Sequence, residues 1–277
     1  MQATVHGVRM GYTDEGQGLP VLFVHGFPLS RGIWQKQVDA FRSSHRVIAP
    51  DLRGFGESAT KPGTATMAQF AADLHALLQK LKTGPVVLVG HSMGGYIAFA
   101  FARKFPEMLR GLVLVGTRPG NDTAETAAGR RTTADKVKAE GPQAVIKAMA
   151  PKMLSAGNQD PGMPGEVRHL MVSSGVEGVI GALLGMAERP DVTEMLPKIS
   201  VPTLVVTGAD DTIIPSAESE KMAQVIPGAW LEVIPHAGHL VAFERADEFN
   251  RAMKTWIGAT GESGRPSPGQ RIAKEPS

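Results

Sequence analysis

The sequence predicts an α/β fold with a mostly parallel central sheet, helices on both faces and a helical cap insertion. Short apolar and β-branched runs recur along the chain, and helical patterns separate most of them. This alternation breaks once, between about residues 118 and 200. A chain of 277 residues that is 42% hydrophobic and 20% charged can bury a core large enough for such a sheet.

Six apolar runs have the composition of strands buried on both faces, which is typical of parallel sheets. They span residues 21–26, 46–51, 86–92, 109–117, 203–211 and 230–235. Helical patterns lie at 31–42, 66–82, 94–105, 216–225 and 241–257. Each helix follows a strand, as expected where helical crossovers connect parallel strands.

Residues 118–200 contain helical patches punctuated by Gly and Pro, and no convincing strand. We interpret them as a cap inserted into a core formed by residues 1–117 and 201–258. Six methionines lie in this insertion and either pack its core or line an adaptable apolar pocket: Met149, Met153, Met163, Met171, Met186 and Met195. Residues 259–277 are poor in large apolar side chains, which predicts a disordered tail.

Charge and composition favour a small-molecule partner. The 29 Lys and Arg residues nearly balance the 27 Asp and Glu residues without forming basic blocks, so we expect a small-molecule partner rather than nucleic acid or a membrane. The absence of cysteine excludes disulfides and thiolate metal sites. No signal-peptide pattern and no apolar run of about 20 residues is present, so we expect a cytoplasmic protein. The oligomeric state stays open.

A serine stands where a predicted strand turns into a predicted helix. Gly90-His91-Ser92-Met93-Gly94 fits the G-x-S-x-G pattern of a nucleophile on a sharp strand-to-helix turn. Side chains in place of the two glycines would collide with the neighbouring strand and helix. We therefore predict that Ser92 is a nucleophile rather than part of a structural turn.

A serine hydroxyl needs a positioned base, and the base needs an orienting acid. Asp210 and Asp211 both follow a predicted strand, at the sheet edge where α/β proteins place their chemistry. His236 and His239 follow the next one. The order Ser, Asp, His is that of the nucleophile-elbow fold. The motif-free histidines are expected to be surface or satisfied residues: His6, His45, His75 and His169.

Acyl transfer also needs donors for a developing oxyanion. Gly26 allows the backbone after the first of these strands to turn, so that the amide of Phe27 can face Ser92. The second donor would be the amide of Met93, at the amino end of a helix, where free N–H groups favour negative charge.

These residues resemble the α/β-hydrolase fold superfamily, and more narrowly its esterase, lactonase and haloperoxidase-like (perhydrolase) branch. The resemblance covers most of the chain and rests on "HGFP", "APDLRGFGES", "GHSMGG", "GADDTIIP" and "AGHLVAFERADEFN", in that order. It implies Ser92 as nucleophile, His239 rather than His236 as base, and Asp211 rather than Asp210 as acid. The loop from Asp51 to Ser58 matches a family segment that looks mainly structural.

The resemblance implies a serine carboxylesterase that cleaves small to medium esters or lactones through an acyl-enzyme, with no metal or organic cofactor. Related haloalkane dehalogenases and epoxide hydrolases carry Asp at the nucleophile position, so Ser92 favours acyl transfer. A perhydrolase activity, a C–C bond hydrolase and a hydroxynitrile lyase remain as alternatives within the enzyme class. A ligand-binding protein of the same fold is the alternative outside it.

Overall fold

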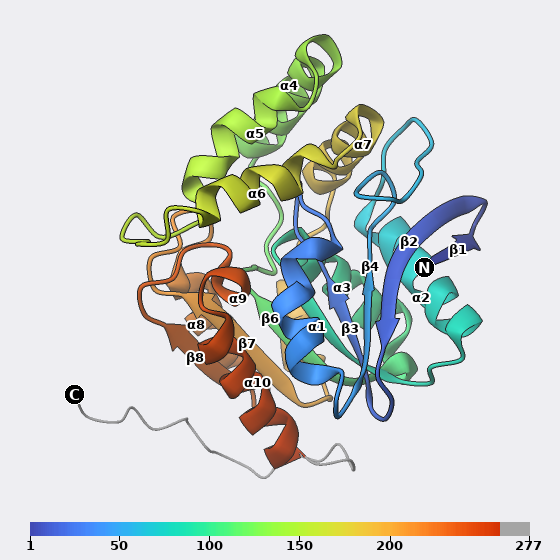
Figure 1. Cartoon of the computed structure of the whole chain (residues 1–277), viewed down its shortest axis with the longest axis vertical. Coiled ribbons are helices and arrows are strands. Elements are labelled where there is room, and N and C mark those ends of the chain that lie inside the picture. The colour runs from blue at the N-terminus through green and yellow to red at the C-terminus, as the bar shows by residue number, and fades with distance from the viewer. Residues whose placement is uncertain (261–277) are drawn as a thin grey trace.

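One sheet forms the centre of the computed structural model, which describes residues 1–260 (Figure 1). In those residues its strands are ordered β1-β2-β4-β3-β5-β6-β7-β8. Their bounds are Gln2–Val5, Val8–Glu15, Pro20–Val24, Arg46–Pro50, Val86–His91, Leu109–Val115, Thr203–Gly208 and Trp230–Ile234, for β1 to β8. The pairs β1–β2 and β2–β4 are antiparallel and the others are parallel, which confirms the predicted fold class.

The antiparallel hairpin of β1 and β2 is absent from the sequence prediction. Its tight turn is formed by His6 and Gly7, both with positive φ, and β1 is short with alternating exposed and buried residues. The predicted burial of the last strand was also wrong. Val233 of β8 is 37% exposed, because β8 is an edge strand with a neighbour on one side only.

Helices cover both faces of the sheet. Side chains alternate between the two faces along each strand, so apolar strands need cover on both faces. Leu22 and Val24 of β3 pack in the cluster that includes α2 (Met67–Leu81) and α3 (Met93–Lys104). Val21 and Phe23 pack in the opposite cluster, with α1 (Gln35–Phe41) and α10 (Ala246–Thr260). Helix α8 (Ser216–Val225) joins the first of these layers through Met222.

Helix boundaries differ from the prediction in two places. The pattern at 31–42 forms a 3-10 turn (Arg31–Trp34) followed by α1, and the pattern at 241–257 divides at Arg245 into α9 (Val241–Glu244) and α10. Helix α10 ends at Thr260, so residues 259 and 260 are helical instead of belonging to the predicted tail. The rest of that prediction, residues 261–277, lies outside the described residues.

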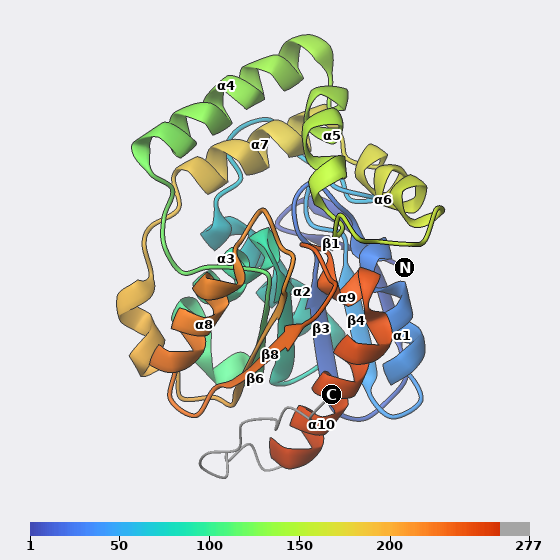
Figure 2. The same ribbon diagram turned by 90° about the vertical axis from the view of Figure 1, so that its left-hand side faces the viewer.

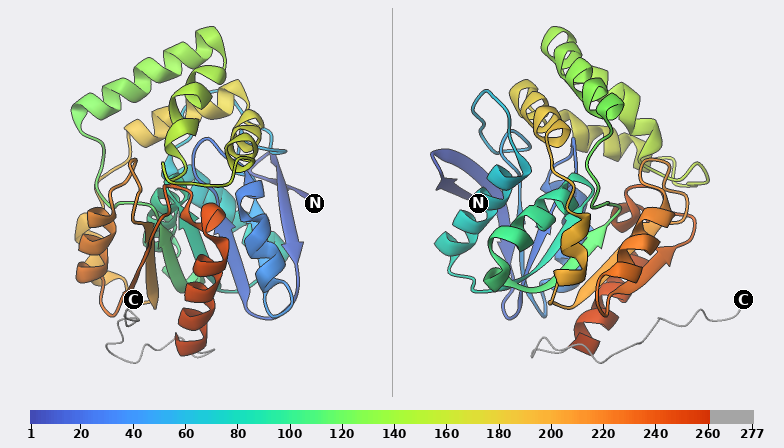
Figure 3. Two further views of the ribbon diagram at one scale, coloured as in Figure 1. Left: turned by 60° about the vertical axis from the view of Figure 1, so that its left-hand side comes forward. Right: turned by 180° about the vertical axis from the view of Figure 1, so that it is seen from behind.

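The chain between β6 and β7 forms a helical layer beyond the carboxyl ends of the parallel strands (Figures 2 and 3). It contains α4 (Ala124–Glu140), α5 (Gln143–Met149), α6 (Met163–Val172) and α7 (Val176–Ala187). All six methionines of the segment belong to, or pack against, the two main hydrophobic clusters. Within residues 1–260 no single helix is long and apolar enough to cross a membrane; only α6 and α7 together, bent by 94°, reach that length and composition.

The loop after β4 is held by a buried carboxylate. Asp51 accepts hydrogen bonds from the backbone N–H of Arg31 at 2.8 Å and of Glu57 at 2.9 Å, and it pairs with the Arg31 guanidinium. A Cβ on Gly56, which has a φ of +53°, would collide with this carboxylate. These contacts hold the backbone of the loop in place.

Helix α7 packs closely on the core through two glycines. A Cβ on Gly178 would collide with the backbone of Gly54, and one on Gly185 would collide with the carbonyl oxygen of Ala65. Gly129 in α4 has open space where a Cβ would stand. Glycine at the first two positions therefore allows the inserted helices to approach the core backbone.

Alanine at these helix positions should change stability in opposite directions. Gly185→Ala forces backbone apart and should lower the free energy of unfolding by about 1–3 kcal/mol. Gly129→Ala meets no obstacle and should raise it by up to about 1 kcal/mol, because alanine favours the helix. Thermal unfolding of the two variants beside the wild type measures both effects. Equal shifts of the two midpoints would contradict the close approach of α7.

Candidate active site

Ser92 occupies a strained turn between β5 and α3. Its φ of +53° and ψ of −112° lie in a region that residues with a Cβ rarely adopt. The turn is held at several points, since the Ser92 N–H donates to the carbonyl of Val115 at 2.8 Å. Its own carbonyl accepts from the N–H of Gly95 at 2.8 Å and from Oγ1 of Thr117 at 2.9 Å. These contacts fix the side chain of Ser92 above the sheet edge.

The glycines around Ser92 are required by close backbone packing. A Cβ on Gly90 would collide with the carbonyl of Gly94, and one on Gly94 would collide with the carbonyl of Val24. A Cβ on Gly26 would lie 3.1 Å from Cβ of Ser92. The turn after β3 therefore passes directly beside the serine.

The structure brings Ser92, His239 and Asp211 into one hydrogen-bonded chain. Nδ1 of His239 lies 2.8 Å from Oδ2 of Asp211, and Nε2 lies 2.9 Å from Oγ of Ser92. Because a carboxylate can only accept, Nδ1 carries the proton and Nε2 is left to accept from the serine hydroxyl. The side chains of His239 and Asp211 are 1% and 0% exposed, whereas Ser92 is half-buried. Of these three residues, Ser92 is therefore the most accessible to solvent.

The environment of Asp211 keeps its carboxylate charged. Burial is the strongest influence and opposes ionisation, but the hydrogen bond and charge of His239 outweigh it together with the N–H groups of Ile214 and Ile213. The net effect lowers the pKa of Asp211. Both amides donate to Oδ1, at 2.8 and 2.9 Å, which leaves Oδ2 for the imidazole.

The competing residues lie elsewhere. Oδ2 of Asp210 accepts a hydrogen bond from Oγ of Ser155 at 2.6 Å. His236 is exposed, and its carbonyl accepts from Nε of Arg245 at 3.0 Å. Neither residue contacts Ser92 or His239 through its side chain in the described part of the chain.

Of the two expected oxyanion donors, the amide of Phe27 follows the Gly26 turn beside Ser92 and the amide of Met93 begins α3. Within residues 1–260 neither amide donates to another group. No cluster of three or more His, Asp or Glu side chains in this range could hold a metal ion.

A family model described as the alpha/beta hydrolase fold matches residues 20–246. The chain belongs to the α/β-hydrolase fold family. Its structure is similar to that of a malate-bound thermophilic esterase from Thermogutta terrifontis, with a TM-score of 0.89 and 45% identity over 92% of this chain and 95% of that one. This α/β-hydrolase is also 33% identical to a non-heme chloroperoxidase of Kitasatospora aureofaciens, over 92% of this chain and 98% of the relative. It is 28% identical to a 3-oxoadipate enol-lactonase of Acinetobacter baylyi, over 91% and 94%.

Two buried histidines support the site of this α/β-hydrolase and are missing from the sequence-based candidates. Nε2 of His91 donates to the carbonyl of His239 at 2.9 Å. Nδ1 of His25 donates to the carbonyl of Gly26 at 2.9 Å, and its Nε2 accepts from the N–H of Leu52 at 3.0 Å. Burial is the main cause that lowers the pKa of both, to about 3 for His91, where the nearby charge of His239 adds to it. Both histidines are therefore neutral near pH 7, and their hydrogen bonds hold the turns beside Ser92 in place.

A buried glutamate joins the His239 loop to the inserted helices. The carboxylate of Glu244 accepts from the N–H of Gly238 at 2.6 Å, from the N–H of Ser155 at 3.1 Å and from Nδ2 of Asn158 at 2.6 Å. Gly238 has no room for a Cβ, because the backbone of Leu154 and Ser155 lies against it. The sequence signal for this residue is a charged side chain within the apolar run that follows His239.

Glu244→Gln should loosen this junction. An amide presents one acceptor oxygen and two unwanted N–H donors, so at least one backbone N–H loses its partner, at a cost of about 1–3 kcal/mol in the free energy of unfolding. Thermal unfolding measures the loss, with Glu220→Gln on the exposed surface of α8 as the matched control. If the two variants unfolded at the same temperature, the Glu244 carboxylate would not hold the loops together.

Stability should also fall below about pH 6.5, the ordinary histidine pKa. In that range the unfolded chain binds a proton at His91, whereas the folded protein, with a pKa of about 3 there, does not. The proton therefore favours unfolding, and His91 alone should cost roughly 2 kcal/mol between pH 7 and pH 5. His25 acts in the same direction.

Denaturant unfolding at the two pH values tests this on the wild type and on His91→Gln, which should show a smaller decrease. An NMR titration of the imidazole resonances gives the same information without a substitution. A His91 ring that gains its proton near pH 6.5 in the folded protein would contradict the prediction.

Proposed function

We propose that this α/β-hydrolase is a serine carboxylesterase that cleaves small to medium carboxylic esters or lactones. The hydrogen-bonded chain from Ser92 through His239 to Asp211 carries the proposal, because it supplies a nucleophile, a base and an orienting acid. A lactone is a cyclic ester and presents the same carbonyl. The esterase and the enol-lactonase among the similar proteins support this substrate class.

The first half of the reaction acylates Ser92. Its Oγ forms a bond to the ester carbonyl carbon while the hydroxyl proton moves to Nε2 of His239. Asp211 stabilises the imidazolium through Nδ1, and the amides of Phe27 and Met93 stabilise the oxyanion. When the C–O bond to the alcohol breaks, Nε2 returns the proton to the leaving oxygen. The acyl group then remains on Ser92.

The second half hydrolyses the acyl-enzyme. Nε2 of His239 takes a proton from a water molecule, which attacks the acyl carbon, and gives that proton to Oγ of Ser92 as the carboxylic acid leaves. Every proton transfer uses a protein atom or water, so this path calls for no cofactor. We also infer that residues 118–200 act as a cap and set the size of the acyl group that reaches Ser92.

A perhydrolase reaction is the second candidate, favoured by the 33% identity to a non-heme chloroperoxidase. Here hydrogen peroxide would replace water in the attack on the acyl-enzyme and yield a peracid, which oxidises halide in solution. Acetate, peroxide and bromide together should then give halogenation above the rate of a Ser92→Ala control. Equal rates in the wild type and Ser92→Ala would contradict the perhydrolase reaction and would not affect the esterase proposal.

Hydrolysis of a series of p-nitrophenyl esters from acetate to dodecanoate, beside several lactones, tests the main proposal. The wild type should show a maximum at one acyl length. Ser92→Ala and His239→Ala should lower turnover by about a million-fold, as replacement of the corresponding residues does in subtilisin. No hydrolysis of any ester or lactone by the wild type would contradict the proposal.

The two neighbouring aspartates provide a matched comparison in the same assay. Asp211→Asn should lower turnover by about 10⁴-fold, because an amide cannot stabilise the correct tautomer and charge of His239. Asp210→Asn keeps an oxygen that accepts from Ser155 and should have a mild effect. A larger loss in Asp210→Asn than in Asp211→Asn would show that the acid is assigned to the wrong residue.

A further inference from the structure

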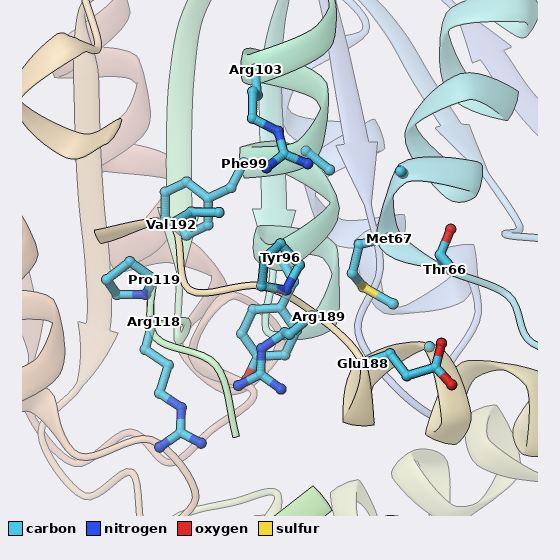
Figure 4. Close-up of a pocket in the computed structure, with 14 residues that line it drawn as sticks. Thr66, Met67, Tyr96, Phe99, Arg103, Arg118, Pro119, Glu188, Arg189 and Val192 are labelled. Atoms are coloured by element: carbon cyan, nitrogen blue, oxygen red, sulfur yellow. The ribbon is translucent and has the colours of Figure 1, made fainter. Parts of the chain in front are cut away.

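A cavity of about 230 Å³ lies on the outer side of α3 and contains none of Ser92, Asp211 and His239 in its lining (Figure 4). Its walls come from α3, from the start of α2 and from both segments that connect the inserted helices to the core. These segments contribute Arg118 and Pro119 on one side and residues 188–190 and 192 on the other. The cavity therefore lies where the core and both connecting segments meet.

One wall of the cavity is apolar and well packed. Phe99, Tyr96 and Met67 are 1%, 7% and 4% exposed and line it together with Pro119 and Val192. The hydroxyl of Tyr96 makes no hydrogen bond to any residue in the described part of the chain. The apolar body of a small organic ligand suits such a wall.

The polar end of the cavity carries excess positive charge. The guanidinium of Arg189 is stacked 4.1 Å from the centre of the Tyr96 ring, and its side chain is 3% exposed. Arg189, Arg118 and Arg130 share the single buried carboxylate of Asp122, so their charge is only partly neutralised. The Nε atoms of Arg189 and Arg118 are buried without a partner.

Arg103 adds an unpaired cation at the rim. It is exposed, and no ion pair or hydrogen bond of its side chain is formed within residues 1–260. In Figure 4 Arg103 lies toward one end of the cavity and the stacked Tyr96 and Arg189 side chains lie toward the other, and the Arg118 side chain points away from them. Glu188 is the only acidic residue of the lining, and it is exposed on the far side.

We propose that this cavity binds a small organic monocarboxylate with an apolar body, separately from the Ser92 site. The carboxylate pairs with Arg103, the cation of the lining that has no partner in the described residues, in the positive field of the other arginines of the lining. The apolar body packs on Phe99 and Met67. A neutral amide of the same shape gains the packing but not the ion pair.

Calorimetric titration of the full chain with benzoate tests the proposal, with benzamide as the neutral isostere. Benzoate should bind the wild type at least about tenfold more tightly than benzamide, the ratio expected for one charge-assisted contact. Arg103→Gln should weaken benzoate binding by about tenfold or more and leave benzamide unchanged. Arg131→Gln, an exposed arginine of α4 outside the cavity, should bind benzoate as the wild type does.

Benzoate that binds equally to the wild type and to Arg103→Gln occupies another place, such as the Ser92 site, and would overturn the proposal. Absence of benzoate binding, or benzamide binding of equal strength, would also overturn it. The readout is binding, so it does not depend on whether the chain hydrolyses esters.

Discussion

The strained backbone at Ser92 is the constraint on which the rest of the structure depends. A positive φ at a residue with a side chain persists only where the surroundings over-determine it. Here they do so through β5, the helix α3, the neighbouring strand β6 and Thr117. This backbone conformation places the Ser92 hydroxyl above the sheet edge. It also requires glycine at positions 26, 90 and 94, because a Cβ at each would come too close to neighbouring backbone or to Ser92 itself.

A second constraint decides which buried side chains near the serine are charged. A buried group ionises only where several partners stabilise its charged form. Asp211 has the imidazole of His239 and two backbone amides, and its pKa is lowered in spite of burial. His25 and His91 each donate to only one carbonyl, so burial prevails and their pKa values fall instead. Glu244 has three donors from two loops and so connects the His239 segment to the inserted helices. The core and the insertion thus meet at polar contacts beside the site.

Local patterns in the sequence predicted the features that depend on residues close together in the chain. The inner strands, the helices and the turn at Ser92 each depend on residues near in the chain, and the order Ser, Asp, His placed three side chains at one sheet edge. The sequence could not assign Glu244, whose partner Ser155 is 89 residues away, or the neutral state of His91, which depends on burial. The β1–β2 hairpin was missed for a different reason, since its strands are short or half-exposed and give weak signals. The cavity beside α3 depends on four segments and has no motif.

The central claim is that Ser92 becomes covalently acylated during turnover. The most direct measurement is mass spectrometry of the protein quenched with acid while it turns over p-nitrophenyl acetate, followed by digestion to locate the modification. The account predicts a transient acetyl group on the peptide that contains Ser92, which disappears once the substrate is consumed. Turnover with no acetyl group on Ser92, or with the group on another residue, would contradict it.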